Sequence, residues 1–198
     1  MHLYPTQRSP GRHFLVAFAL ICGIIFADQY TKWLVMEHVL RVAQDIPAFG
    51  DWFLASQKFA AVMGPQEFRS LTVTPWLNLV MVWNKGISFG MFDSASSNIS
   101  LVFIGISLLI SLLMLIWLAL TPSKLVSFAL ALIIGGAVGN IIDRLRFSAV
   151  VDFIDLHLDG RHWPAFNLAD SCIVLGAVLL SADALFRGGK NKTVETEE

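Results

Sequence analysis

Four long apolar stretches, separated by polar segments, dominate the sequence. They cover residues about 14–36, 99–120, 125–144 and 168–186. A helix that crosses the hydrocarbon core of a membrane needs about 20 consecutive, mostly apolar residues. The second stretch is the clearest, because no charged residue lies between Asp93 and Lys124. The pattern predicts an all-α membrane protein with four transmembrane helices, built as one domain over residues 1–198 with a flexible tail at 188–198.

The composition agrees with this pattern and excludes several classes of protein. Of the 198 residues, 56% are hydrophobic and 15% are charged, whereas soluble domains carry about 25% charged residues. The net charge of −1 offers no basic surface for nucleic acid. Cys22 and Cys172 both lie inside apolar stretches, so the sequence predicts neither a disulfide framework nor a zinc site.

Polar residues gather at one end of the predicted spans. Because consecutive spans run in opposite directions, the end of the first, the start of the second, the end of the third and the start of the fourth meet on one side of the membrane. These ends carry Asp28, Lys32, Asn84, Asn140, Asp143, Arg144, Asn167 and Asp170. Ionisable groups at membrane depth are costly and usually mark a function. The sequence therefore predicts a functional site at this face.

The basic residues indicate on which side of the membrane this face lies. The opposite side carries six in short flanking segments, namely Arg8, Arg12, Lys124, Arg187, Lys190 and Lys192. The polar face carries eight, spread over much longer loops. The positive-inside rule weighs short flanking segments. The density of basic residues therefore predicts cytoplasmic termini and a site on the outer face.

An aspartate stands out in the polar segment after the third span. Residues 150–158 alternate apolar and polar positions, with β-branched and aromatic residues at the start, which favours an extended segment on the membrane face. The alternation puts Asp152 on the side of Ile154 and Leu156, and Asp155 with His157 on the wetter side. Asp152 is therefore the candidate for a perturbed pKa. The alternative is a loop carboxylate bound to backbone amides.

Asp170 lies at the start of the fourth span and has two interpretations. With Asn167 as the N-cap and Asp170 as the third helical residue, the pair forms a variant of the capping box. Alternatively, Asp170 meets Asp152 in a site of low dielectric constant, where two carboxylates share one proton. The ionised partner then takes a proton from water, and the protonated partner donates to the carbonyl oxygen of a peptide bond. That is the arrangement of an aspartic protease.

The remaining polar residues favour a supporting role. Asn140, Asp143 and Arg144 share one helical face, which predicts a structural cluster of ion pairs and hydrogen bonds. Asp28 and Lys32 have the i, i+4 spacing of a salt bridge at the end of a helix. Just before the cluster, closely spaced glycines at 135, 136 and 139 allow a neighbouring helix to approach.

Read together, six segments resemble the lipoprotein signal peptidases, also called signal peptidase II. They are Asp28–Lys32, Pro75–Leu79, Asn84–Gly90, Gly135–Arg144, Val150–Phe153 and Phe166–Asp170, in the order of that family. The resemblance implies an aspartic endopeptidase of the bacterial inner membrane. Such an enzyme removes the signal peptide from prolipoproteins, cleaving before a cysteine that carries diacylglycerol. It also implies four spans, with a small extended or β segment and a loop helix on the periplasmic face.

The resemblance assigns roles to individual residues. Asp152 and Asp170 match the catalytic pair of the family. The positions that match conserved residues around its site are Asp28, Lys32, Asn84, Gly86, Asn140, Asp143, Arg144 and Asn167. The resemblance further implies a monomer in contact with membrane lipid, a site facing the periplasm, inhibition by the cyclic peptide globomycin, and no metal or cofactor.

The sequence departs from the family pattern at three places. Ser148 stands where the family often has glycine, so the local turn is expected to differ. Lys85 and residues 87–88 replace the smaller residues that are common after Asn84. The first loop, about 39–73, is longer than usual, and its segment 59–65 is expected to lie on the membrane.

Two other functions compete with the peptidase. Intramembrane aspartate and arginine also mark ion pathways, which permits a small proton-coupled transporter. Transport sites, however, usually sit near the midplane between repeats, and the sequence shows no repeat. A purely structural membrane subunit is the second alternative, but it leaves the polar cluster unexplained.

Overall fold

Four long helices account for most of the chain. The structure is a computed structural model, and it describes residues 11–42, 45–54, 68–86 and 98–192. The helices are α1 (Gly11–Trp33), α4 (Asn98–Leu120), α5 (Lys124–Phe147) and α6 (Leu168–Lys192). In the described part of the chain, four helices are long and apolar enough to cross a membrane. The predicted architecture of four transmembrane helices is confirmed.

Two helix boundaries differ from the sequence prediction. The first span continues without a break through a π-helix, η1 (Leu34–Leu40), and so extends past Met36. Glu37 does not end it, because its buried carboxylate pairs with Arg41 one turn further along. At the other end of the chain, α6 continues to Lys192, so residues 188–192 of the expected tail are helical. The last six residues lie outside the described part.

Helix α5 lies at the centre of the bundle and contacts α1, α4 and α6. Its span is 67% buried, against 28% or less for the other three. Glycines bring α6 close: a Cβ on Gly136 would lie 2.4 Å from the carbonyl oxygen of Ala169, and one on Gly176 would lie 2.6 Å from that of Ala129. Small residues at such contacts are typical of packed transmembrane helices. The other three helices leave apolar side chains on the outside, as expected beside lipid.

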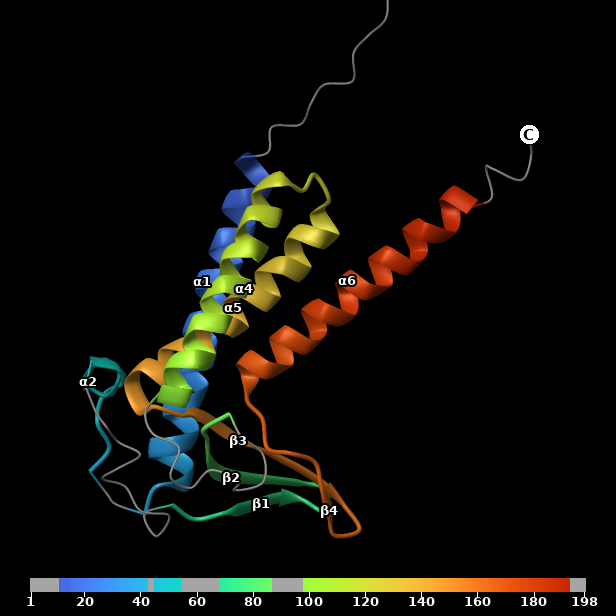
Figure 1. Cartoon of the computed structure of the whole chain (residues 1–198). Helices are drawn as coiled ribbons and strands as arrows, with labels where there is room; N and C mark the ends of the chain where they lie inside the picture. Colours follow the sequence, from blue (N-terminus) through green and yellow to red (C-terminus); the bar gives the residue numbers. More distant parts are fainter. Residues whose placement is uncertain (1–10, 43–44, 55–67, 87–97, 193–198) are drawn as a thin grey trace, which may run out of the picture.

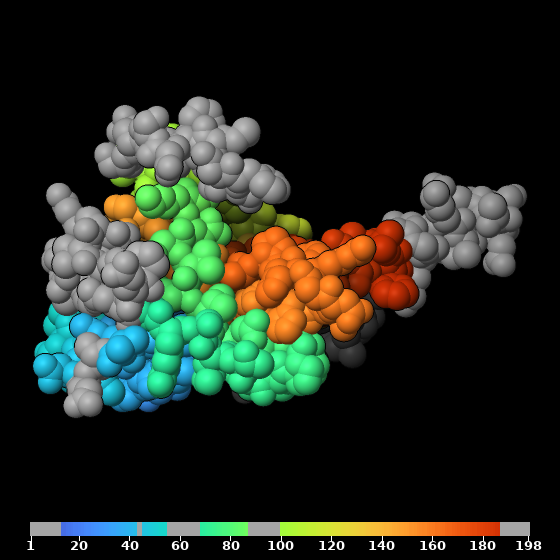
Figure 2. All heavy atoms as spheres, turned by 90° about the horizontal axis from the view of Figure 1, so that it is seen from below, coloured from blue at the N-terminus to red at the C-terminus, as the bar shows by residue number. Residues whose placement is uncertain are grey.

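A small antiparallel sheet closes one end of the bundle (Figure 1). Its strands lie in the order β1 (Leu71–Thr74), β2 (Leu77–Asn84), β3 (Val150–Leu158) and β4 (Arg161–His162). The first residue of α1 and the last residue of α6 lie at the opposite end (Figure 1). Figure 2 shows the sheet end directly, with the green strands β1 and β2 beside the orange strands β3 and β4. The sheet end is the side on which the predicted polar residues lie.

The long first loop contains a short helix, α2 (Phe49–Leu54), at the sheet end of the molecule (Figure 1). The ring of Phe49 lies 5.6 Å from that of Tyr30 and 5.7 Å from that of Trp33. Trp33 also donates a hydrogen bond of 3.0 Å to the carbonyl oxygen of Pro47. Helix α2 is therefore packed against the end of α1. The segment 59–65, expected on the membrane, lies outside the described residues, as do residues 87–88.

Ser148 keeps a turn that normally takes glycine. It ends α5 in the left-handed conformation, with φ 59° and ψ 14°, and its backbone N–H donates to the carbonyl oxygen of Arg144 at 3.0 Å. Helices commonly end in this way, usually on glycine because a Cβ is disfavoured there. The left-handed turn is therefore present with serine, and the serine carries a strained backbone.

Candidate active site

Asp152 is held in the middle of the sheet, on β3. The pairing of β2 and β3 sets Val82 opposite Asp152. Asn84, two residues further along β2, therefore points to the same face. Its side-chain amide donates to Asp152 Oδ2 at 2.9 Å. Asp152 is only 1% exposed.

Asp170 is brought to Asp152 by the segment that leads into α6. Phe166 pairs with Ile154 of β3 as an isolated bridge, with backbone hydrogen bonds of 2.9 and 3.1 Å. This pairing places Asn167, the next residue, beside β3. Asn167 donates to Asp152 Oδ1 at 2.7 Å, and its own Oδ1 accepts from the backbone N–H of Asp170 at 2.9 Å. A single asparagine side chain thus contacts both aspartates.

The capping box predicted for this helix start is present. Asn167 Oδ1 accepts from the backbone of Asp170, and Asp170 Oδ2 accepts from the backbone N–H of Asn167 at 3.3 Å. The second carboxylate oxygen of Asp170 accepts from Asn140 Nδ2 at 2.8 Å. Asp170 is therefore both a cap and a member of the polar site. The two interpretations drawn from the sequence do not exclude each other.

Burial dominates the electrostatics of Asp152. Removal from water raises the pKa of Asp152 to about 7, and the nearby charge of Asp170 acts in the same direction. Hydrogen bonds from Asn84 and Asn167 and the charge of Lys32 oppose this shift. The described side chains that donate to Asp152 are uncharged amides, so no cation directly stabilises its ionised form. Asp152 can therefore carry a proton near neutral pH.

Asp155 is not on a wetter side, as the alternation had predicted. It is 7% exposed and accepts hydrogen bonds from His162 Nδ1 at 2.8 Å and from Asn78 Nδ2 at 3.0 Å. Burial alone would raise the pKa of Asp155, but these hydrogen bonds and the nearby histidines lower it overall. The alternation failed here because the side chains of Asn78 on β2 and His162 on β4 lie against Asp155. Asp152 and Asp155 still differ, since their pKa values shift in opposite directions.

A buried ion cluster supports the site from the helix side. Lys32 Nζ lies 2.8 Å from Asp28 Oδ2 and 2.7 Å from Asp143 Oδ2, and all three side chains are fully buried. The i, i+4 salt bridge of Asp28 and Lys32 is therefore present. Asp143, predicted from its helical face to belong to a cluster of ion pairs and hydrogen bonds, pairs with Lys32 of α1. The reason is that α1 packs against α5 and presents Lys32 to Asp143.

The two buried carboxylates each hold a backbone amide next to an aspartate of the site. Asp28 Oδ1 accepts from the N–H of Ala169 at 3.1 Å, immediately before Asp170. Asp143 Oδ2 accepts from the N–H of Val151 at 3.1 Å, immediately before Asp152. The ion cluster thereby fixes the backbone at both aspartates.

Arg144 and Gly86 lie at the edge of the site around one aromatic ring. The guanidinium of Arg144 lies 5.4 Å from the centroid of Phe103 on α4. Gly86 has φ +87°, and a Cβ there would lie 2.4 Å from the same ring. Its N–H donates to Asn84 Oδ1 at 2.8 Å and so orients the amide that reaches Asp152. In the described part of the chain, Arg144 forms no ion pair, which leaves its charge available beside the two aspartates.

Two residues of the polar network were not predicted from the sequence. Gln29 Nε2 donates to Asp28 Oδ2 at 3.1 Å and to Asp143 Oδ1 at 2.8 Å. Arg146 donates to Gln29 Oε1 at 3.1 Å. Gln29 follows Asp28 directly and could have been found from that position. Nothing in the local sequence separates Arg146 from the other basic residues.

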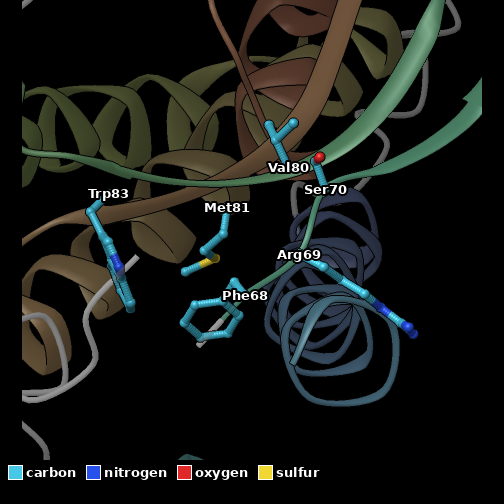
Figure 3. A pocket seen from close by; sticks show the side chains of 6 residues that line it. All are labelled: Phe68, Arg69, Ser70, Val80, Met81 and Trp83. Carbon is cyan, nitrogen blue, oxygen red and sulfur yellow. The ribbon is translucent and has the colours of Figure 1, made fainter. Parts of the chain in front are cut away.

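A pocket lies on the sheet and is lined by residues other than those of the polar site. It has a volume of about 290 Å³ and is lined by Phe68, Arg69, Ser70, Val80, Met81 and Trp83. Figure 3 shows Phe68 and Met81 side by side in it, one from the segment before β1 and the other from β2. None of the lining residues is a carboxylate or a predicted site residue. Over the residues that the structure describes, no group of three or more His, Cys, Asp or Glu could hold a metal ion.

The sequence profile of the family described as signal peptidase (SPase) II matches residues 20–186. The chain belongs to this family. The matched range includes every predicted site residue, from Asp28 to Asp170. Signal peptidase II is a family of aspartic peptidases, which agrees with the two aspartates and their shared hydrogen-bond network.

Relatives from several bacteria support the assignment. The chain is 44% identical over 140 residues to the lipoprotein signal peptidase of Ralstonia nicotianae, which covers 69% of this chain and 80% of the relative. It is 35% identical over 176 residues to that of Acinetobacter baumannii, covering 88% and 85%. Among solved structures, a bacterial membrane enzyme determined by the in meso method at 2.3 Å is similar with a TM-score of 0.63 and 25% identity. That similarity covers 89% of this chain and 91% of the other.

Family membership decides between the functions considered from the sequence. The chain is a multi-pass membrane protein of the signal peptidase II family, and the proton-coupled transporter is not favoured. The geometry agrees, because the buried polar cluster around Lys32, Asp143 and Asp152 lies at the end of the helices that meets the sheet. Transport sites usually lie near the midplane of the membrane.

Proposed function

We propose that the chain is an aspartic endopeptidase that removes signal peptides from prolipoproteins, with Asp152 and Asp170 as its catalytic pair. Family membership supports the reaction. The assignment of the two residues rests on one observation: the side chain of Asn167 contacts both, donating to Asp152 and accepting from the backbone of Asp170. Together with Asn84 and Asn140, this asparagine holds two carboxylates at one site.

The different surroundings of the two aspartates give them different roles. Asp152 holds the proton near neutral pH, because burial raises its pKa to about 7, and donates it to the carbonyl oxygen of the scissile peptide. Asp170 takes a proton from the attacking water as the new C–O bond forms. The tetrahedral product then breaks its C–N bond, and the leaving nitrogen takes the proton from Asp170. As the carbonyl group re-forms, a hydroxyl of the intermediate returns its proton to Asp152, so Asp152 is again protonated and Asp170 is again ionised.

Family membership also supports a proposal for the substrate and the location. The cut is proposed to lie before a diacylglyceryl-modified cysteine, at the sheet end of the molecule. This end faces the periplasm of the bacterial inner membrane and the termini face the cytoplasm, as the density of basic residues indicates. The enzyme acts as a monomer surrounded by lipid, uses no metal or cofactor, and is inhibited by globomycin. Activity is expected to persist in a chelator such as EDTA.

Substitution of each aspartate by asparagine tests the assignment. Asparagine can still accept the hydrogen bond of the capping box from the N–H of Asn167, so Asp170→Asn keeps the helix start while it removes the carboxylate and one of its two acceptors. Both Asp152→Asn and Asp170→Asn are expected to abolish processing of a prolipoprotein in membranes. Asp155→Asn, three residues along the same strand, is the matched control and should retain activity. Turnover near that of the parent chain in either catalytic variant would refute the assignment.

A further inference from the structure

Arg146 binds the loop helix α2 to the end of α5. Its guanidinium carbon lies 4.0 Å from the ring centroid of Trp52, 4.4 Å from that of Phe147 and 5.0 Å from that of Phe53. It also donates a hydrogen bond to the carbonyl oxygen of Trp52. Trp52 is 1% exposed. A guanidinium over aromatic faces is attracted by their negative π-systems, more strongly when water is excluded.

The same guanidinium reaches the buried ion cluster through Gln29. Arg146 donates to Gln29 Oε1 at 3.1 Å, while Gln29 Nε2 donates to both Asp28 and Asp143. An amide has one acceptor end and one donor end. A cation on the oxygen therefore keeps the NH₂ group turned toward the two carboxylates. Without Arg146, the amide could turn and bring its oxygen against them.

The charges of the cluster explain why a cation is needed at this position. Asp28 and Asp143 share one lysine, Lys32, which leaves a net charge of −1 for the ionised trio. Among the described residues, Arg146 forms no ion pair with a carboxylate. Its charge lies one side chain away, across Gln29, and offsets the excess negative charge.

We propose that Arg146 is a positioning residue that couples the docking of α2 to the geometry of the catalytic pair. The coupling passes through Gln29 to Asp28 and Asp143, which hold the backbone amides of Ala169 and Val151. These amides lie immediately before Asp170 and Asp152. The inference rests on the proposed peptidase function, because its effect is measured as turnover. It gives the long first loop of this chain a role in catalysis.

The packing of α2 distinguishes this coupling from a merely structural contact. Phe49 holds α2 on α1 through Tyr30 and Trp33, independently of Arg146. Loss of the guanidinium is therefore expected to loosen α2 and free Gln29 without unfolding the chain. If the contact between Arg146 and α2 served only packing, its loss would change the mobility of α2 and leave the turnover unchanged.

A double-mutant cycle on the full-length chain in lipid tests the coupling. Arg146→Gln is expected to lower kcat about tenfold, the effect of losing one charge-assisted hydrogen bond, with KM changed less than about twofold. Gln29→Leu should lower kcat to a similar extent while hydrogen exchange in the α2 peptide stays as in the parent chain. Arg146→Lys, which keeps the charge, should restore part of the activity. The kcat of the double variant should be no lower than that of the less active single variant, because both substitutions interrupt the same path.

Controls separate failure of the coupling from failure of the peptidase assignment. Arg161→Gln, an exposed arginine on β4, removes the same charge at the sheet end and should leave kcat unchanged. Additive losses in the double variant, or a kcat for Arg146→Gln within about twofold of the parent, would overturn the coupling alone. A parent chain that does not cleave prolipoprotein would overturn the proposed function and the coupling with it. Asp152→Asn run alongside gives the baseline of an inactive site.

Discussion

The backbone amide of Val151 donates a 3.1 Å hydrogen bond to the buried carboxylate of Asp143. The two residues lie on different elements, β3 and α5, and the bond joins the sheet to the bundle directly before Asp152. Asp28 makes the equivalent bond to Ala169 directly before Asp170. The ion cluster of the helices therefore sets the positions of both aspartates, although none of its members is proposed to touch the substrate.

Removal of the shared cation is expected to destabilise the protein strongly. Lys32→Met leaves Asp28 and Asp143 buried without the cation that pairs with both, and breaking a buried ion pair typically costs about 3–5 kcal/mol. Asp143→Asn removes one of the two negative charges and keeps an oxygen for Val151, so its effect on unfolding should be much smaller. Thermal unfolding in detergent measures both. Equal stability of the two variants would contradict the role assigned to Lys32.

The pH dependence of turnover is expected to be bell-shaped, because the pair needs one protonated and one ionised carboxyl group. On the alkaline side, turnover should decrease with a midpoint near pH 7, where Asp152 loses its proton. The hydrogen bond from Asn84 favours the ionised form, so Asn84→Ala should raise the pKa of Asp152 and move this limb to higher pH. Asn78→Ala, which removes the corresponding bond to Asp155, is the control and should leave the limb in place. A limb that moves to lower pH in Asn84→Ala would contradict this account.

The stability of the fold should also depend on the ionisation of Asp152. Its pKa is higher in the folded chain than in the unfolded chain, so the folded state binds more protons between pH about 4 and 7. Its contribution to stability is therefore fully present at low pH and is lost as the pH rises through 7. Asp152→Asn should raise the unfolding temperature above pH 7, and the gain should shrink toward pH 4. A gain that is independent of pH would show that Asp152 is not the group responsible.

Relief of the strained turn at the end of α5 should stabilise the protein. Ser148 has a φ of 59°, and a residue with a Cβ in this conformation costs about 1–2 kcal/mol. Ser148→Gly is expected to recover about 1 kcal/mol, offset in part by the greater freedom of glycine when unfolded. Ser127→Gly, inside the same helix, should instead lower the stability of the protein, because glycine is unfavourable in the interior of a helix. Thermal unfolding of the two variants gives the comparison, and a destabilising Ser148→Gly would rule out strain at this turn.

Local patterns predicted much of the fold and part of the site. Long apolar stretches set the four helices, because a membrane requires length and low polarity whatever the neighbours are. The capping box of Asn167 and Asp170 was also predicted, since it depends on residues only three positions apart. Alternating spans correctly implied that the polar residues meet at one end.

Ion pairs and hydrogen bonds between residues far apart in the sequence could not be predicted from local patterns. Asp143 pairs with Lys32 on α1 and not with adjacent Arg144, because helix packing decides which side chains face each other. Asp155 is buried because the β3–β4 hairpin brings His162 over it.

The sequence by itself determined the membrane class, the span positions and the family, since hydropathy and short motifs are properties of the chain alone. Only the tertiary structure showed that Asn167 contacts both aspartates and that Arg146 links α2 to the ion cluster through Gln29. Gln29 and Arg146 lie 117 positions apart. Hydrogen bonds and burial of this kind exist only after the helices and the sheet have packed, and burial is what raises the pKa of Asp152. The chemistry of the site therefore follows from the packing, although the residues that perform it can be recognised in the sequence.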